Sequence, residues 1–142
     1  MRTGSQLRNG LKALAVAAAI AVSPANGASP PAGVLSGANE VPPVQTTASA
    51  TSTIVIGGDH KVRGTIETRG IDGTMAHVHE GAPGTNGPVL VKLIKSAPGV
   101  WTVPDGTELT AAQYDSYRKG MLYVNVHSEA HPSGELRMQL QP

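Results

Sequence analysis

The stretch Ala76-His77-Val78-His79-Glu80-Gly81-Ala82-Pro83-Gly84 places two histidines two residues apart in a short run that ends in a Gly/Pro turn. Such a run predicts a β-strand, in which successive side chains point to opposite faces, so His77 and His79 share one face. At a rise of about 3.3 Å per residue, their Cβ atoms lie about 6–7 Å apart. Two imidazoles at that spacing can bind one metal ion, at about 2.0–2.1 Å per bond.

A second pair of histidines, His127 and His131, comes late in the chain. The segment from 121 to 127 predicts another strand, in which Asn125 and His127 share the face opposite to that of its apolar residues. We expect this strand to lie beside the first histidine strand. The candidate metal ligands are therefore His77, His79, His127 and His131, and imidazole suits copper, zinc and nickel.

Two carboxylates could assist the histidines in binding a metal, and a second interpretation of the histidines needs no metal. Glu80 and Glu129 lie close in sequence to the histidines and could orient an imidazole or add an oxygen ligand. Alternatively, His77 and Asn125 bind loop carbonyls at the end of the domain without any metal, because a buried histidine usually finds a hydrogen-bond partner. Both interpretations place polar groups on the same strands.

The surrounding chain predicts an all-β fold, an antiparallel sandwich or barrel of about seven or eight short strands with one short helix. Apolar or alternating runs recur at a spacing of roughly 8–12 residues, separated by Gly, Pro, Asn and Asp. The helix is expected between Leu109 and Lys119, since Thr110 fits an N-cap and Gln113 completes a capping box. Gly120 can end it.

The N-terminus predicts export. A basic N-terminal segment with Arg2 and Arg8 precedes an Ala-rich apolar segment. A small-x-small cleavage site follows, immediately before Ala28. We therefore divide the chain into a signal peptide (1–27), a flexible lead-in (28–34) and one β domain (35–142). The mature protein is expected in the periplasm or outside the cell, with no membrane association after cleavage.

Composition excludes several classes of function. Without the leader the net charge is −2, because three of the 11 basic residues and none of the 10 acidic ones are removed. A mildly acidic domain without a basic stripe argues against nucleic-acid binding. The chain has no cysteine, which excludes disulfides, thiolate zinc sites, thiol catalysis and blue-copper ligation.

One charged pair near the C-terminus has two interpretations. Glu135 and Arg137 lie two residues apart on one face of a predicted strand. They could anchor the loop that follows His127, but the simpler interpretation is a surface ion pair, which contributes about 0–1 kcal/mol. We favour the surface pair at this point.

The order of several short motifs resembles the CHRD domain, a module named for its repeats in chordin and also found alone in exported bacterial proteins. The resemblance implies an all-β domain between Leu35 and Leu140. In chordin the modules belong to an extracellular protein that binds growth factors. The motifs that carry it are Leu35-Ser36-Gly37, Glu40-Val41-Pro42-Pro43-Val44, Ala76-His77-Val78-His79-Glu80-Gly81, Tyr123-Val124-Asn125-Val126-His127 and Pro132-x-Gly134-Glu135-Leu136-Arg137-x-Gln139.

Three functions remain open. The first is an exported β domain that binds a transition metal through its histidines. Copper is favoured because an exported protein works in an oxidising compartment, and zinc is the other candidate. The second is a metal-free interaction module with an extracellular protein partner, as the chordin resemblance implies. The third is a copper-dependent redox activity of superoxide dismutase type, which needs an open coordination position. No nucleophile or catalytic triad is evident, so an enzyme is not the favoured interpretation.

Overall fold

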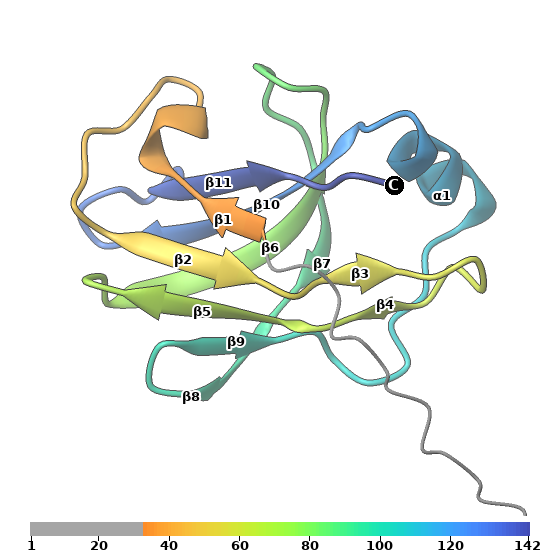
Figure 1. Cartoon of the computed structure of the whole chain (residues 1–142), viewed down its shortest axis with the longest axis horizontal. Coiled ribbons are helices and arrows are strands. Elements are labelled where there is room, and N and C mark those ends of the chain that lie inside the picture. Colours follow the sequence, from red (N-terminus) through yellow and green to blue (C-terminus); the bar gives the residue numbers. More distant parts are fainter. Residues whose placement is uncertain (1–32) are drawn as a thin grey trace, which may run out of the picture.

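A computed structural model describes residues 33–142, so the predicted leader and most of the lead-in lie outside the described residues. Two antiparallel sheets and one small two-stranded sheet make up this part (Figure 1). The five-stranded sheet has the order β1 (Gly33–Leu35), β2 (Ser49–Ser52), β5 (Thr65–Arg69), β9 (Val100–Thr102) and β8 (Ile94–Ala97). The four-stranded sheet has the order β11 (Leu136–Gln139), β10 (Leu122–Ser128), β6 (Gly73–Glu80) and β7 (Val89–Lys92). The predicted all-β sandwich is confirmed, and none of the described sheets closes into a barrel.

The strands are shorter and more numerous than the seven or eight expected because two stretches of the chain are each divided into two strands. Residues 48–56 contain β2 and β3 (Val55–Ile56), and residues 61–69 contain β4 (Val62–Arg63) and β5. Gly64 separates β4 from β5 with φ +123°, and a Cβ there would lie 2.5 Å from the carbonyl oxygen of Thr53. This bend lets β3 and β4 pair with each other outside the larger sheet.

The apolar core lies between the two larger sheets. Alternate residues of β6 and β10, such as Val78 and Val124, are fully buried and face Ile66 and Trp101 of the five-stranded sheet in one cluster. The predicted inward face of β10 is thereby confirmed. Because alternation is strict in a strand, the neighbours of these residues project from the other side of the four-stranded sheet.

The helix α1 (Ala111–Arg118) closes one end of the sandwich. Its capping box is present as predicted: Thr110 Oγ1 accepts from the Gln113 N–H at 3.2 Å, and Gln113 Oε1 accepts from the Thr110 N–H at 2.9 Å. Gly120 follows it with φ +70°. A short 3₁₀ helix, η1 (Gly37–Asn39), lies near β11. Among residues 33–142, no helix is long and apolar enough to cross a membrane.

Candidate metal centre

Three histidines gather on the face of the four-stranded sheet that points away from the core. His77 and His79 come from β6 and His127 from the adjacent β10, as predicted. In the antiparallel register, Asn125 is opposite His77 and Tyr123 is opposite His79. Each histidine is only 7% exposed, although this face has no second sheet over it. Loops cover it instead, so the site is a buried polar layer.

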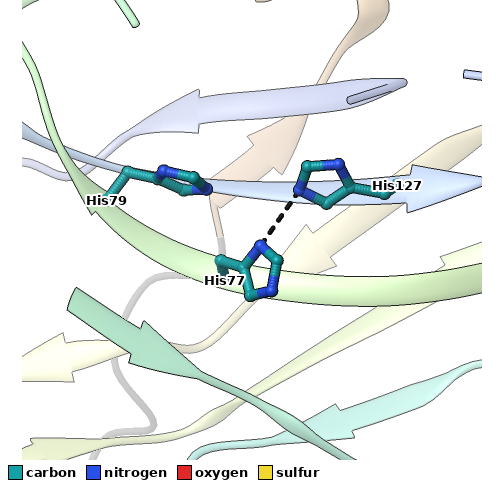
Figure 2. A group of neighbouring side chains, drawn as sticks. All are labelled: His77, His79 and His127. Carbon is teal, nitrogen blue, oxygen red and sulfur yellow. Dashed lines mark hydrogen bonds between the residues drawn. The ribbon is translucent and has the colours of Figure 1, made fainter. Parts of the chain in front are cut away.

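The three imidazoles point a nitrogen toward a common space (Figure 2). One ligand nitrogen from each ring lies within 4.8 Å of the others. His77 Nδ1 and His127 Nε2 are 3.1 Å apart. Nitrogens bound tetrahedrally to one ion at about 2.05 Å lie about 3.3 Å apart. Small rotations of the rings would therefore bring all three nitrogens to bonding distance.

Backbone carbonyls determine which nitrogens face this space. His79 Nδ1–H donates to the carbonyl of Gly87 at 2.9 Å, and His127 Nδ1–H donates to the carbonyl of Pro132 at 2.9 Å. In a neutral imidazole the other nitrogen then carries a lone pair. Metal-bound histidines almost always have such a second hydrogen bond, which fixes the tautomer and the ring orientation.

The inward nitrogen of His79 has no partner. His79 Nε2 is buried and makes no hydrogen bond, whereas most buried side-chain nitrogens make at least one. The ring cannot turn away easily, because it stacks on Tyr123 with centroids 4.7 Å apart and an interplanar angle of 3°. Arg137 Cζ lies 3.5 Å from the centroid of the same tyrosine ring. This unpaired lone pair is what a metal ion would bind.

Burial keeps the imidazoles uncharged. Burial, together with the smaller effects of the nearby His127, His79 and Lys92, lowers the pKa of His77 to about 4. Burial also lowers the pKa of His79 and of His127, against the opposing effect of their hydrogen bonds to Gly87 and Pro132. All three are therefore neutral at pH 7, which is the protonation state that binds metals.

The comparisons with known proteins identify the family. The family model of the CHRD domain matches residues 32–140. The chain belongs to the CHRD domain family. No curated protein and no solved structure matches. The resemblance inferred from the motifs is thus confirmed at the level of the family.

The two loops that supply the carbonyls are fixed in place in this CHRD domain. A Cβ on Gly87 would lie 1.7 Å from the Glu80 carbonyl oxygen, so only glycine lets the β6–β7 loop approach β6 this closely. In the β10–β11 loop, the buried Glu135 carboxylate accepts hydrogen bonds from Ser128 Oγ and Thr46 Oγ1. Although burial raises the pKa of Glu135, these two hydrogen bonds and the nearby His131 together lower it below its usual value.

The expected surface ion pair between Glu135 and Arg137 is wrong. Both residues are buried, and the ion pairs among the described residues join other, exposed side chains. Glu135 acts instead as the anchor of the loop after His127. Arg137 donates to Asn86 Oδ1 at 3.3 Å and to the Ala82 carbonyl at 3.2 Å, so it ties the β6–β7 loop to β11. Each residue therefore holds a different loop, Glu135 the one after β10 and Arg137 the one after β6. The strand pattern does not reveal this because it does not show which loops cover a face.

The fourth predicted ligand, His131, does not join the cluster in the described structure. It lies in the β10–β11 loop, where its carbonyl accepts from the N–H groups of Ser128 and Gly134. Of the nearby carboxylates, Glu80 accepts from Ser116 Oγ of α1, and Glu129 is exposed. The structure thus brings together His77, His79 and His127 only.

Sequence reasoning gave no role to Glu40, which comes from the loop after η1. Its side chain is 5% exposed, and Oε1 is buried without a hydrogen-bond partner. Burial raises the pKa of Glu40 to about 7, although Arg137, Val41 and Asn125 act to lower it. The motif Glu40-Val41-Pro42-Pro43 was visible in the sequence, but nothing in it indicates that the loop folds over the histidine face.

Proposed function

We propose that this CHRD domain is an exported metal-binding module that holds one transition-metal ion with His77, His79 and His127. The observation that carries the proposal is the buried, unpartnered Nε2 of His79 beside the inward nitrogens of the other two imidazoles. The metal-free alternative, in which the buried polar side chains satisfy only loop carbonyls and one another, explains Nδ1 of His79 and of His127. It also explains the 3.1 Å contact between His77 Nδ1 and His127 Nε2 as a hydrogen bond, but it leaves His79 Nε2 without a partner.

Copper is the favoured ion and zinc the second candidate. Imidazole nitrogens suit both, and the absence of cysteine suits a site that works in an oxidising compartment. The export signal predicted in residues 1–27 supports a location in such a compartment. When bound, the ion would supply redox chemistry as copper, or Lewis-acid or purely structural chemistry as zinc. The imidazoles, held by Gly87 and Pro132, would orient it.

The first experiment is a metal titration of the full chain, purified and stripped with a chelator. A ligand that binds only the folded state at a hundredfold excess over its Kd adds about 2.7 kcal/mol of stability. We expect Cu(II) to raise Tm by roughly 10 °C in the native protein. We expect no rise in His79→Ala. His131→Ala is the matched control, since this histidine lies outside the cluster, and it should respond as the native protein does.

Two results would contradict the proposal. One is a native protein whose Tm is unchanged by Cu(II) and by Zn(II). The other is an equal metal response in the native protein and in His79→Ala. A response lost in His131→Ala would instead restore the fourth predicted ligand. Intact mass of the protein recovered after expression with its leader tests the export prediction, which requires a chain that begins at Ala28.

A dismutase-like redox activity is the second candidate. The observation in its favour is that three histidine nitrogens by themselves leave a position open for a small molecule, as a catalytic site requires, so a fourth protein donor would count against it. Superoxide consumption by the copper-loaded protein, compared with His79→Ala under equal total copper, tests it directly. An interaction module has less support, because the two most exposed large apolar residues, Val34 and Ile94, lie on strands at opposite edges of the five-stranded sheet.

A further inference from the structure

We infer that the side-chain oxygen of Asn125 is the fourth donor of the proposed metal site, and that Glu40 holds the Asn125 amide in the orientation that this requires. The inference rests on the proposed function, which it makes more specific. It assigns an N₃O donor set, three imidazole nitrogens and one amide oxygen, where the histidine pattern alone gives three ligands.

Asn125 lies at the centre of the buried polar layer. It sits on β10, directly opposite His77 and two residues before His127 on the same face. Its Oδ1 is 3.0 Å from His127 Nε2, the same nitrogen that is 3.1 Å from His77 Nδ1. Asn125 is 2% exposed, so no bulk water competes for that oxygen. The amide oxygen therefore shares the space toward which the imidazoles point.

The contact between Asn125 Oδ1 and His127 Nε2 joins two acceptors. His127 Nδ1 holds the ring's proton because it donates to the Pro132 carbonyl, so Nε2 presents a lone pair. Two lone pairs at 3.0 Å repel each other unless a positive group lies between or beside them. A metal ion bound to both atoms resolves the repulsion. His77 Nδ1–H can donate to His127 Nε2 without a metal, but that bond leaves Asn125 Oδ1 facing a nitrogen that has no proton to give it.

Glu40 favours one of the two orientations of the Asn125 amide, the one with Nδ2 toward the carboxyl group. An ideal Cβ on Gly134 would lie 2.6 Å from Glu40 Oε1 and 2.9 Å from Asn125 Nδ2, so the carboxyl oxygen and the amide nitrogen occupy the same small space. An amide N–H₂ beside a carboxylate oxygen is favourable, whereas the flipped amide would place two oxygens there when Glu40 is ionised. With Nδ2 on the side of the Glu40 carboxyl group, Oδ1 is left facing the histidines.

Gly134 makes this arrangement possible. Its φ is +129°, and any side chain would collide with both Glu40 and Asn125. The loop after β10 thus supplies a carbonyl for His127 at Pro132 and an open space for the Glu40 side chain two residues later. An amide oxygen is a harder donor than a thioether, so the resulting N₃O set favours a divalent ion such as Cu(II) or Zn(II) over Cu(I).

The test measures Cu(II) affinity by competition with a chromophoric chelator, and the number of bound waters by water-proton relaxation. We expect Asn125→Ala to weaken Cu(II) binding about 10–100-fold, in the range seen for lost orienting groups, and to raise the relaxation rate as water takes the vacated position. The double variant Asn125→Asp/Glu40→Gln keeps an oxygen at the site without two adjacent carboxylates. It should restore the affinity and the low relaxation rate.

Glu40→Gln and a control complete the test. Glu40→Gln leaves Asn125 in place but offers it both a donor and an acceptor, so we expect weaker Cu(II) binding with an unchanged Tm of the metal-free protein or a higher one. Ser96→Ala is the control, since this serine on β8 contacts Val100 and Thr102 but no residue of the site. It should bind Cu(II) as the native protein does.

The outcomes distinguish a failure of metal binding by the histidines from a failure of Asn125 as the fourth donor. If the native protein binds no metal, the proposed function fails. If the native protein binds Cu(II) through the histidines, but folded Asn125→Ala matches it in affinity and relaxation rate, the fourth donor is wrong and the site has three ligands. If Asn125→Ala loses affinity and the double variant fails to regain it while both remain folded, Asn125 shapes the site without donating its oxygen, and the inference is equally overturned.

Discussion

The two faces of the four-stranded sheet are buried to nearly the same extent, but by different means. Toward the other sheet, Val78, Leu122 and Val124 are covered by apolar side chains and have no exposed surface. On the opposite face, His79, Asn125 and Arg137 are covered by loops and are at most 7% exposed. One face is an ordinary hydrophobic core. The other is a polar layer in which every donor and acceptor needs a partner.

The difference between the faces shows where function resides. Burying apolar area stabilises the fold by itself, and many side chains of similar volume would serve. Burying imidazoles, an amide and a guanidinium costs free energy unless their hydrogen bonds are complete. On this polar face the hydrogen bonds are nearly complete, and the exceptions, His79 Nε2 and Glu40 Oε1, flank Asn125. An incomplete polar layer is a reason to look for a missing ligand.

The largest effect is expected from the apolar face. Leu122→Ala removes a fully buried side chain, and such truncations cost about 2–5 kcal/mol of unfolding free energy. The loss should be the same with and without Cu(II), because Leu122 points away from the histidines. Chemical denaturation of both forms measures it. A loss that depends on metal would show that the two faces are energetically coupled.

The second effect concerns the polar face and depends on pH. Burial raises the pKa of Glu40 to about 7. Its contribution to the free energy of unfolding is therefore greatest below about pH 4.5, where the group is protonated in both states, and is lost as pH rises through 7. In the metal-free protein, Glu40→Gln should therefore gain about 3 kcal/mol relative to the native protein between pH 4.5 and 8. Urea denaturation across this range measures the difference. A difference independent of pH would mean that Glu40 is not buried as a free acid.

The third effect tests the loop cover. Gly87→Ala forces the β6–β7 loop away from β6, because the new Cβ would overlap the Glu80 carbonyl. Overpacking of this kind costs about 1–3 kcal/mol, and here it also withdraws the carbonyl that orients His79. We expect lower stability together with weaker Cu(II) binding. Gly84→Ala in the same loop, where no atom lies close but φ is +76°, controls for backbone strain alone.

The smallest effect comes from the stacked guanidinium. Arg137→Lys keeps the charge but loses the planar contact with Tyr123, which contributes about 0.5–2 kcal/mol. Stability should fall by about that amount. Metal affinity should fall less than in Asn125→Ala, since Arg137 does not contact the histidines and acts through the tyrosine ring and the β6–β7 loop. Equal losses of affinity would place Arg137 in direct control of the site.

The sequence predicted the sheet faces and the histidine cluster because both follow from strand periodicity. His77, His79 and His127 share a face by alternation, and an antiparallel partner for β6 brings His127 beside them. The capping box of α1 was equally local. The strand count was too low because Gly64 bends the chain, and the expected ion pair of Glu135 failed because alternation says nothing about which loops return over a face.

The remaining parts of the site depend on contacts that no local pattern encodes. Glu40 reaches Asn125 from about 85 positions earlier in the chain, through a loop whose path the prolines do not specify. Gly87 and Gly134 looked like ordinary turn residues, although a Cβ at either would collide with atoms that hold the site. His131 was the weaker candidate in the sequence because it precedes Pro132 in a predicted loop, and only His127 lies on a strand.

The separation of the histidines along the chain has a kinetic consequence. His77 and His127 are 50 residues apart, and the carbonyls that orient the rings come from two different loops. Contacts this distant require much of the sheet to be assembled first, so the complete site arises late during folding. Interactions that are absent from the folding transition state slow unfolding without speeding refolding. An ion in this site would therefore act as a latch, extending the lifetime of a domain that lacks disulfides.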